Sequence, residues 1–524
     1  MSKEDSSEES ICNIGEEAAN RTAESTPVKG YENPSLQDPS YFKCRWKEYL
    51  FIFSSMVSQL LNQAASTQTN PLFNVLSDDF NSSTAEQTWL MASFALVSGS
   101  FILVSGKFGD IYGLKKSLLG GYAVIIIWSL ICGFTTYAHS VNFFIVARAF
   151  QGLGIAFIVP NIMGIVGNVY VPGSKRKNMV ISLIGSCAPI GATLGVVFSG
   201  LIATKSTNWA WTFYAYAIVA AINACIAYWI IPNSIPTNVH NFSMDWIGSA
   251  IGVTGLILFN FVWNQGPIVG WGKAYVIVLL IVSVIILVTF FVYEAKYAKE
   301  PLLPHAALFN RHLLMILLSI FFGWGSFGIW TFYYMSFVLN LRHYTPLWAG
   351  GTYFTFAIFG IIAALFVGFS IHKVHPSIIL LLSMLAFDSG CIMLSVTPVH
   401  QTYFRMILGM QVILSFGMDL SFPAASIILS DKLPPQHQGM AGSLVSTMVS
   451  YSMSLCLGIG GTVEHQINKT GEDLLKGYRA ALYLGIGLAS LGAAISFAFM
   501  VENLYLIRKT KLEQQKDVES KSHI

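Results

Sequence analysis

The sequence predicts an all-α integral membrane protein with two six-helix bundles, an inserted helix pair and about fourteen spanning helices. Three observations predict this class. Hydrophobic residues make up 54% of the chain and charged residues only 11%, against roughly 25% charged in soluble domains. Apolar stretches recur that are long enough to cross a hydrocarbon layer of about 30 Å, which takes roughly 20 residues. The hydropathy pattern also repeats after 263 residues.

The chain begins with a segment that we do not expect to enter the membrane. Residues 1–45 are rich in Ser, Glu, Asn and Pro and lack the basic start and short apolar core of a cleaved signal peptide. We therefore expect a disordered cytosolic tail. The first six-helix bundle should occupy 46–232, with spans near 49–70, 86–106, 117–137, 142–168, 178–203 and 209–231.

The middle of the chain, residues 233–300, should hold a linker and the inserted helix pair. Its two spans lie near 246–264 and 274–294, divided by the turn sequence "NQGPIVGWGK". The second six-helix bundle is expected at 301–503 and a cytosolic tail at 504–524. The spans of this bundle lie near 312–338, 347–370, 376–396, 401–430, 439–462 and 479–502.

Basic residues gather in the loops of one face, which predicts the orientation. With an even number of spans, Lys107, Lys175 and Lys296 share a face with both tails, and the positive-inside rule makes that face cytosolic. The glycosylation candidates Asn81 and Asn468 then fall in outer loops. We expect a multi-pass monomer in the plasma membrane, with the vacuolar membrane as the alternative. The expected partners are the lipid bilayer and a small-molecule substrate, and no nucleic acid.

The offset of 263 residues places the first span on the ninth and continues span by span. In the fourth and twelfth spans it sets Gly154 over Gly417 and Pro160 over Pro423. Parallel repeats of this kind are typical of transporters that rock two bundles about a site at the membrane midplane. The alternative is that evenly spaced helices of any membrane protein match themselves at some offset.

The stretch "GKFGDIYGLKK", residues 106–116, interrupts the apolar sequence between the second and third spans. Gly106, Gly109 and Gly113 should let the two helices turn sharply and pack closely. Asp110 can accept hydrogen bonds from a helix N-terminus across the bundle interface, and Lys115 should hold the loop on the cytosolic side. We expect a cytosolic latch that closes in one conformation and breaks in the other.

Two motifs lie in the fourth and fifth spans. In "RAFQGLG", Arg148 stands within an apolar helix, where an arginine costs roughly 3 kcal/mol unless it has a polar partner or a water-filled cavity. The alternative is an arginine that reaches out to the interface. In "GSCAPIGATLGVVFSG", Gly191 and Gly195 allow backbone contact between helices and Pro189 bends the segment. Generic tight packing would explain the same residues.

Two acids are candidates for carrying a proton. Asp419 lies deep in the twelfth span, and Asp388 in the eleventh is the second choice. A carboxyl at such depth can load and unload a proton, and each charge moved through 100 mV is worth about 2.3 kcal/mol. The alternative is a structural pair with Arg405 or a helix end.

A central cavity should be lined by polar and aromatic side chains of three spans. Amides can hydrogen-bond a small uncharged solute, and aromatic faces can bind apolar groups or cations. The alternative for each aromatic residue is contact with lipid or a neighbouring helix. The candidates are Asn62, Gln63, Gln68, Asn70, Asn161, Trp324, Trp330 and Tyr333.

These motifs resemble those of the major facilitator superfamily. Gly106, Asp110, Gly113 and Lys115 match its loop signature G-x-L-A-D-R-x-G-R-K, although Ile111 and Leu114 replace two arginines. In the fourth span, "RAFQG" matches R-x-x-Q-G, whose arginine the resemblance implicates in proton coupling. The fifth span resembles the antiporter motif that ends in G-P-x-x-G-G, with alanines for two glycines, and this favours an exporter.

The inserted pair is similar to that of the fourteen-span drug:H+ antiporters, in particular the fungal aminotriazole-resistance and boron-exporter group. That group also includes a proposed low-affinity ammonium transporter. Many fourteen-span antiporters carry an aspartate in the first helix, where this chain has Asn62. Because an amide does not release a proton near neutral pH, the titrating group must lie elsewhere.

The sequence therefore predicts a proton-coupled exporter of small toxic or xenobiotic solutes that works by alternating access. Arg148, Asp419 and Asp388 are the coupling candidates. The alternative is a facilitator or channel-like carrier for a small polar solute such as ammonium. We expect no enzyme activity, no metal site and no cofactor other than the proton as coupling ion.

Overall fold

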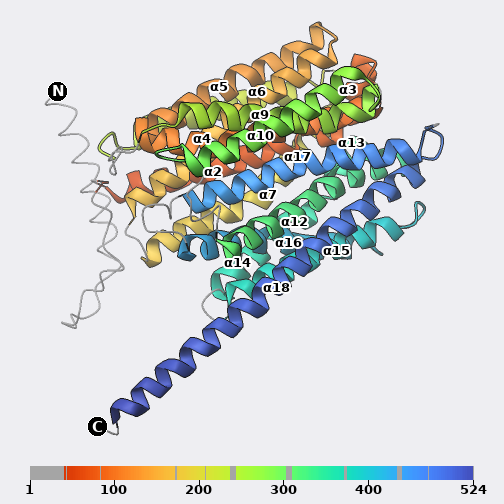
Figure 1. Cartoon of the computed structure of the whole chain (residues 1–524). Coiled ribbons are helices and arrows are strands. Elements are labelled where there is room, and N and C mark those ends of the chain that lie inside the picture. The colour runs from red at the N-terminus through yellow and green to blue at the C-terminus, as the bar shows by residue number, and fades with distance from the viewer. Residues whose placement is uncertain are drawn as a thin grey trace, which may run out of the picture.

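The computed structural model describes residues 41–522 except 43, 83, 171–173, 207, 236–242, 303–309, 371–373, 433–439 and 470. Most of the tail predicted at 1–45 lies outside these residues. Every regular element in the described ranges is a helix. The helices run roughly parallel to one another, and the last of them extends well beyond the others (Figure 1).

The N-terminal lobe contains six long helices and three short ones. Long apolar runs form them, and the breaks fall at polar caps such as Ser140 and Ser174, whose side chains accept hydrogen bonds from helix-start N–H groups. The elements are α2 (Arg45–Thr67), η2 (Asn70–Leu72), α3 (Phe73–Phe80), α4 (Thr84–Tyr112), α5 (Leu114–Phe134), η3 (Thr135–Tyr137), α6 (Val141–Val169), α7 (Lys175–Lys205) and α8 (Trp211–Ile230).

The inserted pair and the C-terminal lobe follow. The pair consists of α9 (Trp246–Val269) and α10 (Ala274–Lys296). The lobe consists of α12 (Arg311–Ser336), the π-helix η4 (Phe337–Leu341), α13 (Pro346–Gly351), α14 (Phe354–Ser370), α15 (Pro376–Val396), α16 (Ile407–Lys432), α17 (Ala441–Ile467) and α18 (Leu474–Ser522).

Among the described residues, 13 helical segments are long and apolar enough to cross a membrane. The helix α2 is not one of them because several polar side chains lower its hydropathy, yet it packs against α6, α7 and α8 as a full member of its lobe. With α2 included, the structure contains the fourteen spanning helices that the sequence predicts.

Three predicted boundaries differ from the structure. The second span was expected to end near residue 106, but α4 continues to Tyr112, so most of the expected latch loop is helical. The span predicted at 347–370 is broken into α13 and α14. The predicted tail at 504–524 continues α18 as a helix to Ser522. A hydropathy window detects where apolar residues stop, whereas a helix ends where its backbone hydrogen bonding stops.

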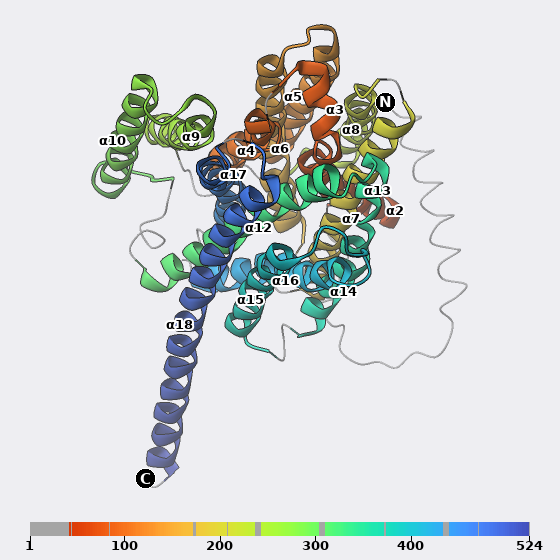
Figure 2. The same ribbon diagram turned by 90° about the vertical axis from the view of Figure 1, so that its right-hand side faces the viewer.

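The two lobes meet along two seams. The helix α4 packs against α17, and α7 packs against α13 and α14. A view along the helices separates α5, α6 and α8 from α14, α15 and α16, with α9 and α10 at one side (Figure 2). The helix α9 contacts both α4 and α17, so the inserted pair lies against one of the two seams between the lobes.

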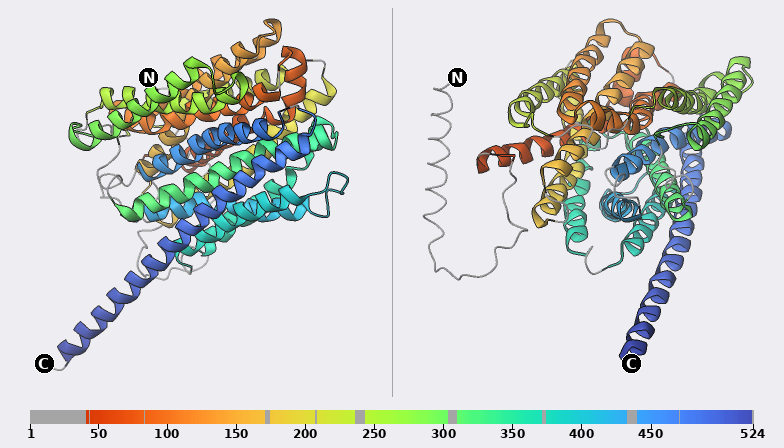
Figure 3. Two further views of the ribbon diagram at one scale, coloured as in Figure 1. Left: turned by 45° about the vertical axis from the view of Figure 1, so that its right-hand side comes forward. Right: turned by 60° about the vertical axis from the view of Figure 1, so that its left-hand side comes forward.

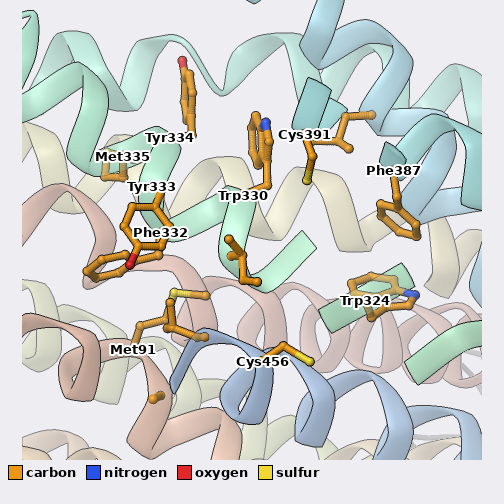
Figure 4. Packing of buried hydrophobic residues seen from close by; sticks show 14 of the residues in the cluster. Met91, Trp324, Trp330, Phe332, Tyr333, Tyr334, Met335, Phe387, Cys391 and Cys456 are labelled. Carbon is orange, nitrogen blue, oxygen red and sulfur yellow. The ribbon is translucent and has the colours of Figure 1, made fainter. Parts of the chain in front are cut away.

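The structural repeat follows the 263-residue offset. When 263 is added to the residue numbers of α5 (114–134), the result is 377–397, which nearly coincides with α15 at 376–396. The same shift of α7 (175–205) gives 438–468, which nearly coincides with α17 at 441–467. One apolar cluster lies within the N-terminal lobe, and a larger one joins residues of both lobes. In the C-terminal lobe, Trp330 and Tyr334 stack with ring centroids 4.8 Å apart, and their neighbours fill the space between α12, α15 and α17 (Figure 4). The long C-terminal part of α18 leaves the bundle in every view (Figure 3).

Candidate functional site

Two ends of the bundle need names. The latch end is the end at which α4 turns into α5, at residues 106–116, and the far end is the one at which η2 and α3 follow α2. The turn at the latch end is made by Gly113 alone, with φ at 115°. Because a side chain would be strained at that φ, glycine is required there. The Gly113 N–H donates to the Gly109 carbonyl at 2.9 Å.

The other latch residues lie on the last turns of α4 and the first turn of α5. A Cβ added at Gly106 would lie 3.0 Å from Ser443 Oγ of α17, so α4 touches the C-terminal lobe there. Lys115 donates from Nζ to the Ile231 carbonyl at 2.6 Å and thereby binds the end of α8 within its own lobe. Asp110 is exposed at the end of α4. Residues 433–439, before the α17 N-terminus that would serve as its partner, lie outside the described ranges.

Lys107 has contacts that the sequence did not suggest. Its Nζ donates to the Glu300 carbonyl at 2.5 Å and to the Pro301 carbonyl at 3.2 Å. These carbonyls belong to the segment that leads from α10 toward the C-terminal lobe. The end of α4 is therefore bound to the chain that follows the inserted pair.

Arg148 is fully buried and points into its own lobe rather than to the interface. It donates to Gln151 Oε1 at 2.7 Å and to the Ala65 carbonyl of α2 at 2.9 Å, and its guanidinium lies 4.7 Å from the centre of the Phe94 ring. Gln151 in turn donates to Ser129 at 2.7 Å. The alternative of an arginine that reaches the interface is therefore wrong, because the side chain finds carbonyl and amide partners inside the bundle.

Pro189, Gly191 and Gly195 lie on α7 and serve two different contacts. A Cβ at Gly191 would lie 2.8 Å from the Leu60 Cα, and one at Gly195 would lie 2.8 Å from the Ala64 Cα, so α7 packs on the α2 backbone. Pro189 lies on the side of α7 that meets the other lobe. There a Cβ at Gly360 of α14 would lie 2.6 Å from Pro189 Cγ.

Asp419 lies at the same contact between the lobes. It is half-buried on α16, and a Cβ at Gly360 would lie 2.8 Å from its Oδ2. That oxygen is shielded and accepts no hydrogen bond from the described residues. A carboxylate in such a place costs far more free energy than a neutral carboxyl. Two residues further along α16, Ser421 accepts a hydrogen bond from Trp324 Nε1 at 3.0 Å.

Asp388 lies elsewhere. It is half-buried on α15 and accepts a hydrogen bond from Ser490 of α18 at 3.2 Å. The helices α15 and α18 pack within the C-terminal lobe, so this carboxyl is away from the joint between the lobes. Arg405, its expected alternative partner, is exposed.

The expected cavity residues other than Trp324 are spread over four environments. Asn62 and Gln63 are half-buried on α2. Asn161 is buried on α6 near the latch end, where a Cβ at Gly109 would lie 2.8 Å from its Cγ. Trp330 and Tyr333 are fully buried in the aromatic cluster of the C-terminal lobe, as Figure 4 shows. Gln68 and Asn70 are buried where α2 ends, and Gln68 Nε2 and both Asn70 amide atoms have no hydrogen bond of standard geometry.

Contacts close the space between the lobes at the far end. Asn74 donates to Asn340 Oδ1 at 2.8 Å, and the rings of Phe73 and Phe332 lie 5.2 Å apart. We call these four residues the far-end gate. Beside it, Thr193 of α7 donates to the Tyr353 carbonyl at 2.9 Å. The structure therefore shows a conformation with the far end closed.

The two glycosylation candidates differ in exposure. Asn81 is exposed and ends α3 in a left-handed conformation with φ at 50°. Asn468 is buried, and its side-chain oxygen accepts a hydrogen bond from the Asp473 N–H at 3.1 Å. Asn81 is thus the more accessible of the two.

Sequence reasoning missed a buried ion pair at the latch end. Glu48 on α2 accepts from Arg176 Nε at 2.7 Å and from the Tyr170 hydroxyl at 2.9 Å. Burial and the adjacent Glu48 carboxylate raise the pKa of Tyr170, so this hydroxyl remains a donor. The pair joins the starts of α2 and α7 to the end of α6. A glutamate at the edge of an apolar run was the one available signal.

Comparisons with known proteins agree with these motifs. The sequence profile of the Major Facilitator Superfamily matches residues 55–455 and 362–522. The chain is 62% identical over 507 residues to the aminotriazole resistance protein of Saccharomyces cerevisiae, covering 96% of this chain and 94% of that protein. It is 40% identical over 491 residues to the low affinity ammonium transporter of the same yeast, covering 92% and 94%. It is 36% identical over 459 residues to the efflux pump terJ of Aspergillus terreus, covering 86% and 88%.

Proposed function

The chain belongs to the major facilitator superfamily, and from that premise we propose that it is a proton-coupled exporter of small toxic or xenobiotic solutes. The two lobes rock about the α4–α17 and α7–α14 seams, and a proton on Asp419 biases that motion. The observation that carries this proposal is the position of Asp419. Its Oδ2 lies without a hydrogen bond beside Gly360, where α14 meets Pro189 of the antiporter motif.

Proton loading at this position changes the energy of the contact between the lobes. An ionised Asp419 is costly while α14 presses on α7, because none of the ion pairs among the described residues includes it. A neutral Asp419 tolerates the same contact. Protonation therefore favours the conformation with the far end closed, and loss of the proton favours separation of α14 from α7. Asp388 lacks this position and is a weaker coupling candidate.

Arg148 has a supporting role in this mechanism. Its two hydrogen bonds and the Phe94 ring fix its charge within the N-terminal lobe. The solute would enter between the half-buried amides of α2 and the Trp324–Ser421 pair, where hydrogen bonds and one aromatic edge are available.

Membrane and orientation are part of the proposal. The basic residues at the latch end, among them Lys107, Lys115 and Arg176, favour a cytosolic latch end and an extracellular far end. Both termini are then cytosolic. We propose the plasma membrane as the site of action and a monomer as the working unit.

A second candidate function is facilitated movement of a small polar solute such as ammonium. The amide-rich first helix, with Asn62 in place of a titrating aspartate, favours it, as does the 40% identity to the low affinity ammonium transporter of yeast. In that case flux would follow the solute gradient alone.

One experiment separates the two functions. Purified protein in liposomes is tested with aminotriazole, borate and methylammonium, with and without an imposed pH gradient. The exporter predicts that a pH gradient drives at least one of the first two solutes against its own concentration gradient. Flux of methylammonium that ignores the pH gradient, together with no driven movement of the other two, would contradict export and support the facilitator.

A further inference from the structure

A buried chain of polar side chains leads away from the far-end gate into the C-terminal lobe. Asn340 on η4 accepts a hydrogen bond from Asn74 at 2.8 Å and donates from Nδ2 to the Tyr478 hydroxyl of α18 at 2.9 Å. Tyr478 is buried, and its ring lies 5.4 Å from that of Tyr333 on α12. A hydrogen bond between the lobes is thus connected to two tyrosines inside one lobe.

The chain of side chains ends at Glu464 of α17. A Cβ at Gly477 of α18 would lie 3.0 Å from the Glu464 Cγ, so the glutamate packs directly against the turn that carries Tyr478. The carboxyl interacts electrostatically with the hydroxyls of both Tyr333 and Tyr478. The Tyr333 hydroxyl is buried and has no hydrogen bond of standard geometry, so its proton is available to this carboxyl.

Glu464 has no counter-ion in the described part of the chain. The titratable groups that face it there are Tyr333 from α12 and Tyr478 from α18. A carboxyl near a membrane interface without a basic partner is seldom explained by packing alone. Neither the proposed coupling residues nor the latch uses it.

The hydrogen bonds of this chain share one direction. Asn74 donates to Asn340, and Asn340 donates to Tyr478, whose hydroxyl also has Ser336 as a neighbour and lies within the electrostatic reach of Glu464. An ionised carboxyl only accepts hydrogen bonds, whereas a protonated carboxyl also donates. An ionised Glu464 therefore matches the donor and acceptor order of this series of side chains, and it strengthens each hydrogen bond in the series through polarisation. A neutral carboxyl weakens that arrangement.

We propose that Glu464 is a proton-binding site that controls the far-end gate. When Glu464 is ionised, its carboxylate attracts the hydroxyl protons of Tyr333 and Tyr478. This stabilises the Asn74–Asn340 hydrogen bond and keeps the far-end gate closed. When its carboxylate takes a proton from the aqueous phase at the far end, that bond weakens and the far end opens more often. The proton returns to the same side, so Glu464 senses pH there and Asp419 carries the transported proton. This inference rests on the proposed rocking of the two lobes.

Distances across the far end test the proposal. Spin labels at Tyr137→Cys and His400→Cys, both exposed and on different lobes, report opening in protein free of its native cysteines. The measurements use lipid nanodiscs without solute or pH gradient, from pH 5 to pH 8. All variants carry Asp419→Asn, which removes the response of the other carboxyl. They therefore report on the gate whether or not the protein exports.

In this background we expect the open population to rise about fivefold at acid pH, a typical size for coupling between sites. Glu464→Gln should hold the open population at its acid level throughout, whereas Glu472→Gln, the matched exposed carboxyl at the same end, should leave the response intact. Tyr478→Phe keeps the ring and should also remove the response. A pH response that survives Glu464→Gln or Tyr478→Phe, or none in the background, overturns the proposal.

Discussion

The helices α6 and α16 occupy equivalent positions in the two lobes. They carry charged residues of opposite sign, and the surroundings of these two residues differ. The 263-residue offset places Arg148 of α6 on Gln411 of α16, and Asp419 of α16 on Ala156 of α6. Arg148 is buried with two hydrogen bonds and an aromatic face. Asp419 has an oxygen without any hydrogen bond, at the contact with the other lobe. Two guanidinium nitrogens of Arg148 have partners within one lobe, although its Nε has no hydrogen bond among the described residues, whereas the carboxyl of Asp419 lies at the contact between the lobes.

This difference teaches that burial alone does not identify a coupling residue. A charge fixed by partners within one rigid body has the same energy in both conformations of a rocking protein. A charge at the contact changes its surroundings when the lobes move, so it can couple protonation to motion. We therefore propose a structural role for Arg148 and the coupling role for Asp419.

The largest expected effect is on stability, from Arg148→Met. The change leaves Gln151 and the Ala65 carbonyl without their buried donor and should cost about 3 kcal/mol of unfolding free energy. The matched control is Gln411→Met, at the equivalent position of the other lobe, where one hydrogen bond from Tyr403 at 2.8 Å is lost and about 1 kcal/mol is expected. Thermal unfolding of the purified proteins measures both. Equal losses of unfolding free energy in the two variants would contradict the proposed difference between the lobes.

The second effect is on transport, from Asp419→Asn. Removing the proton site should reduce pH-driven export at least tenfold, which corresponds to about 1.4 kcal/mol. The unfolding temperature should stay the same or rise, because an uncompensated carboxylate is lost. Liposome efflux and thermal unfolding give the two numbers. Full pH-driven export with Asn at 419 would show that the joint does not couple.

The third effect concerns the contact itself. Gly360→Ala places a methyl group 2.6 Å from Pro189 Cγ and 2.8 Å from Asp419 Oδ2, and this overpacking should cost about 1 kcal/mol in the closed conformation alone. Export should slow about fivefold. Gly351→Ala, on the same span with its nearest recorded neighbour 4.0 Å away, should be neutral. Equal rates for the two variants would place the moving contact elsewhere.

The smallest effect is expected from Asp388→Asn. This carboxyl accepts one hydrogen bond from Ser490 within its own lobe, so export should change by less than about twofold. The pH profile of efflux should keep its shape. A shifted pH profile would indicate that the coupling carboxyl lies on α15 and not at the contact between the lobes.

Much of the fold follows from residues that the sequence shows directly. Apolar runs predicted the spans, and α9 and α10 begin at the expected residues 246 and 274. The turn between the second and third spans was placed correctly, but its shape was not. Lys107 and Asp110 suggested a loop, whereas α4 remains helical to Tyr112 and only Gly113 turns. Charges mark the edge of the apolar layer, and they do not end a helix.

The site was harder to predict because its contacts join residues far apart in the sequence. The sequence singled out Arg148 and Asp419 as charged residues in apolar helices. It did not show which of the two has hydrogen-bond partners. It gave no indication that Glu48 meets Arg176, or that Glu464 faces two tyrosines. The aromatic run around Trp330 predicted a cavity lining, although the side chain is fully buried. The spacing of residues predicts which of them share a helix face. It does not predict which residues of other helices contact that face, because those contacts depend on the tertiary packing.

The most direct test measures protons while the solute moves. Liposomes that contain the protein and an internal pH dye receive an aminotriazole gradient with no imposed pH difference. The account predicts a pH change opposite in direction to solute movement, which disappears in Asp419→Asn and persists in Asp388→Asn. Solute movement without any pH change, or an equal pH change in both variants, would contradict it.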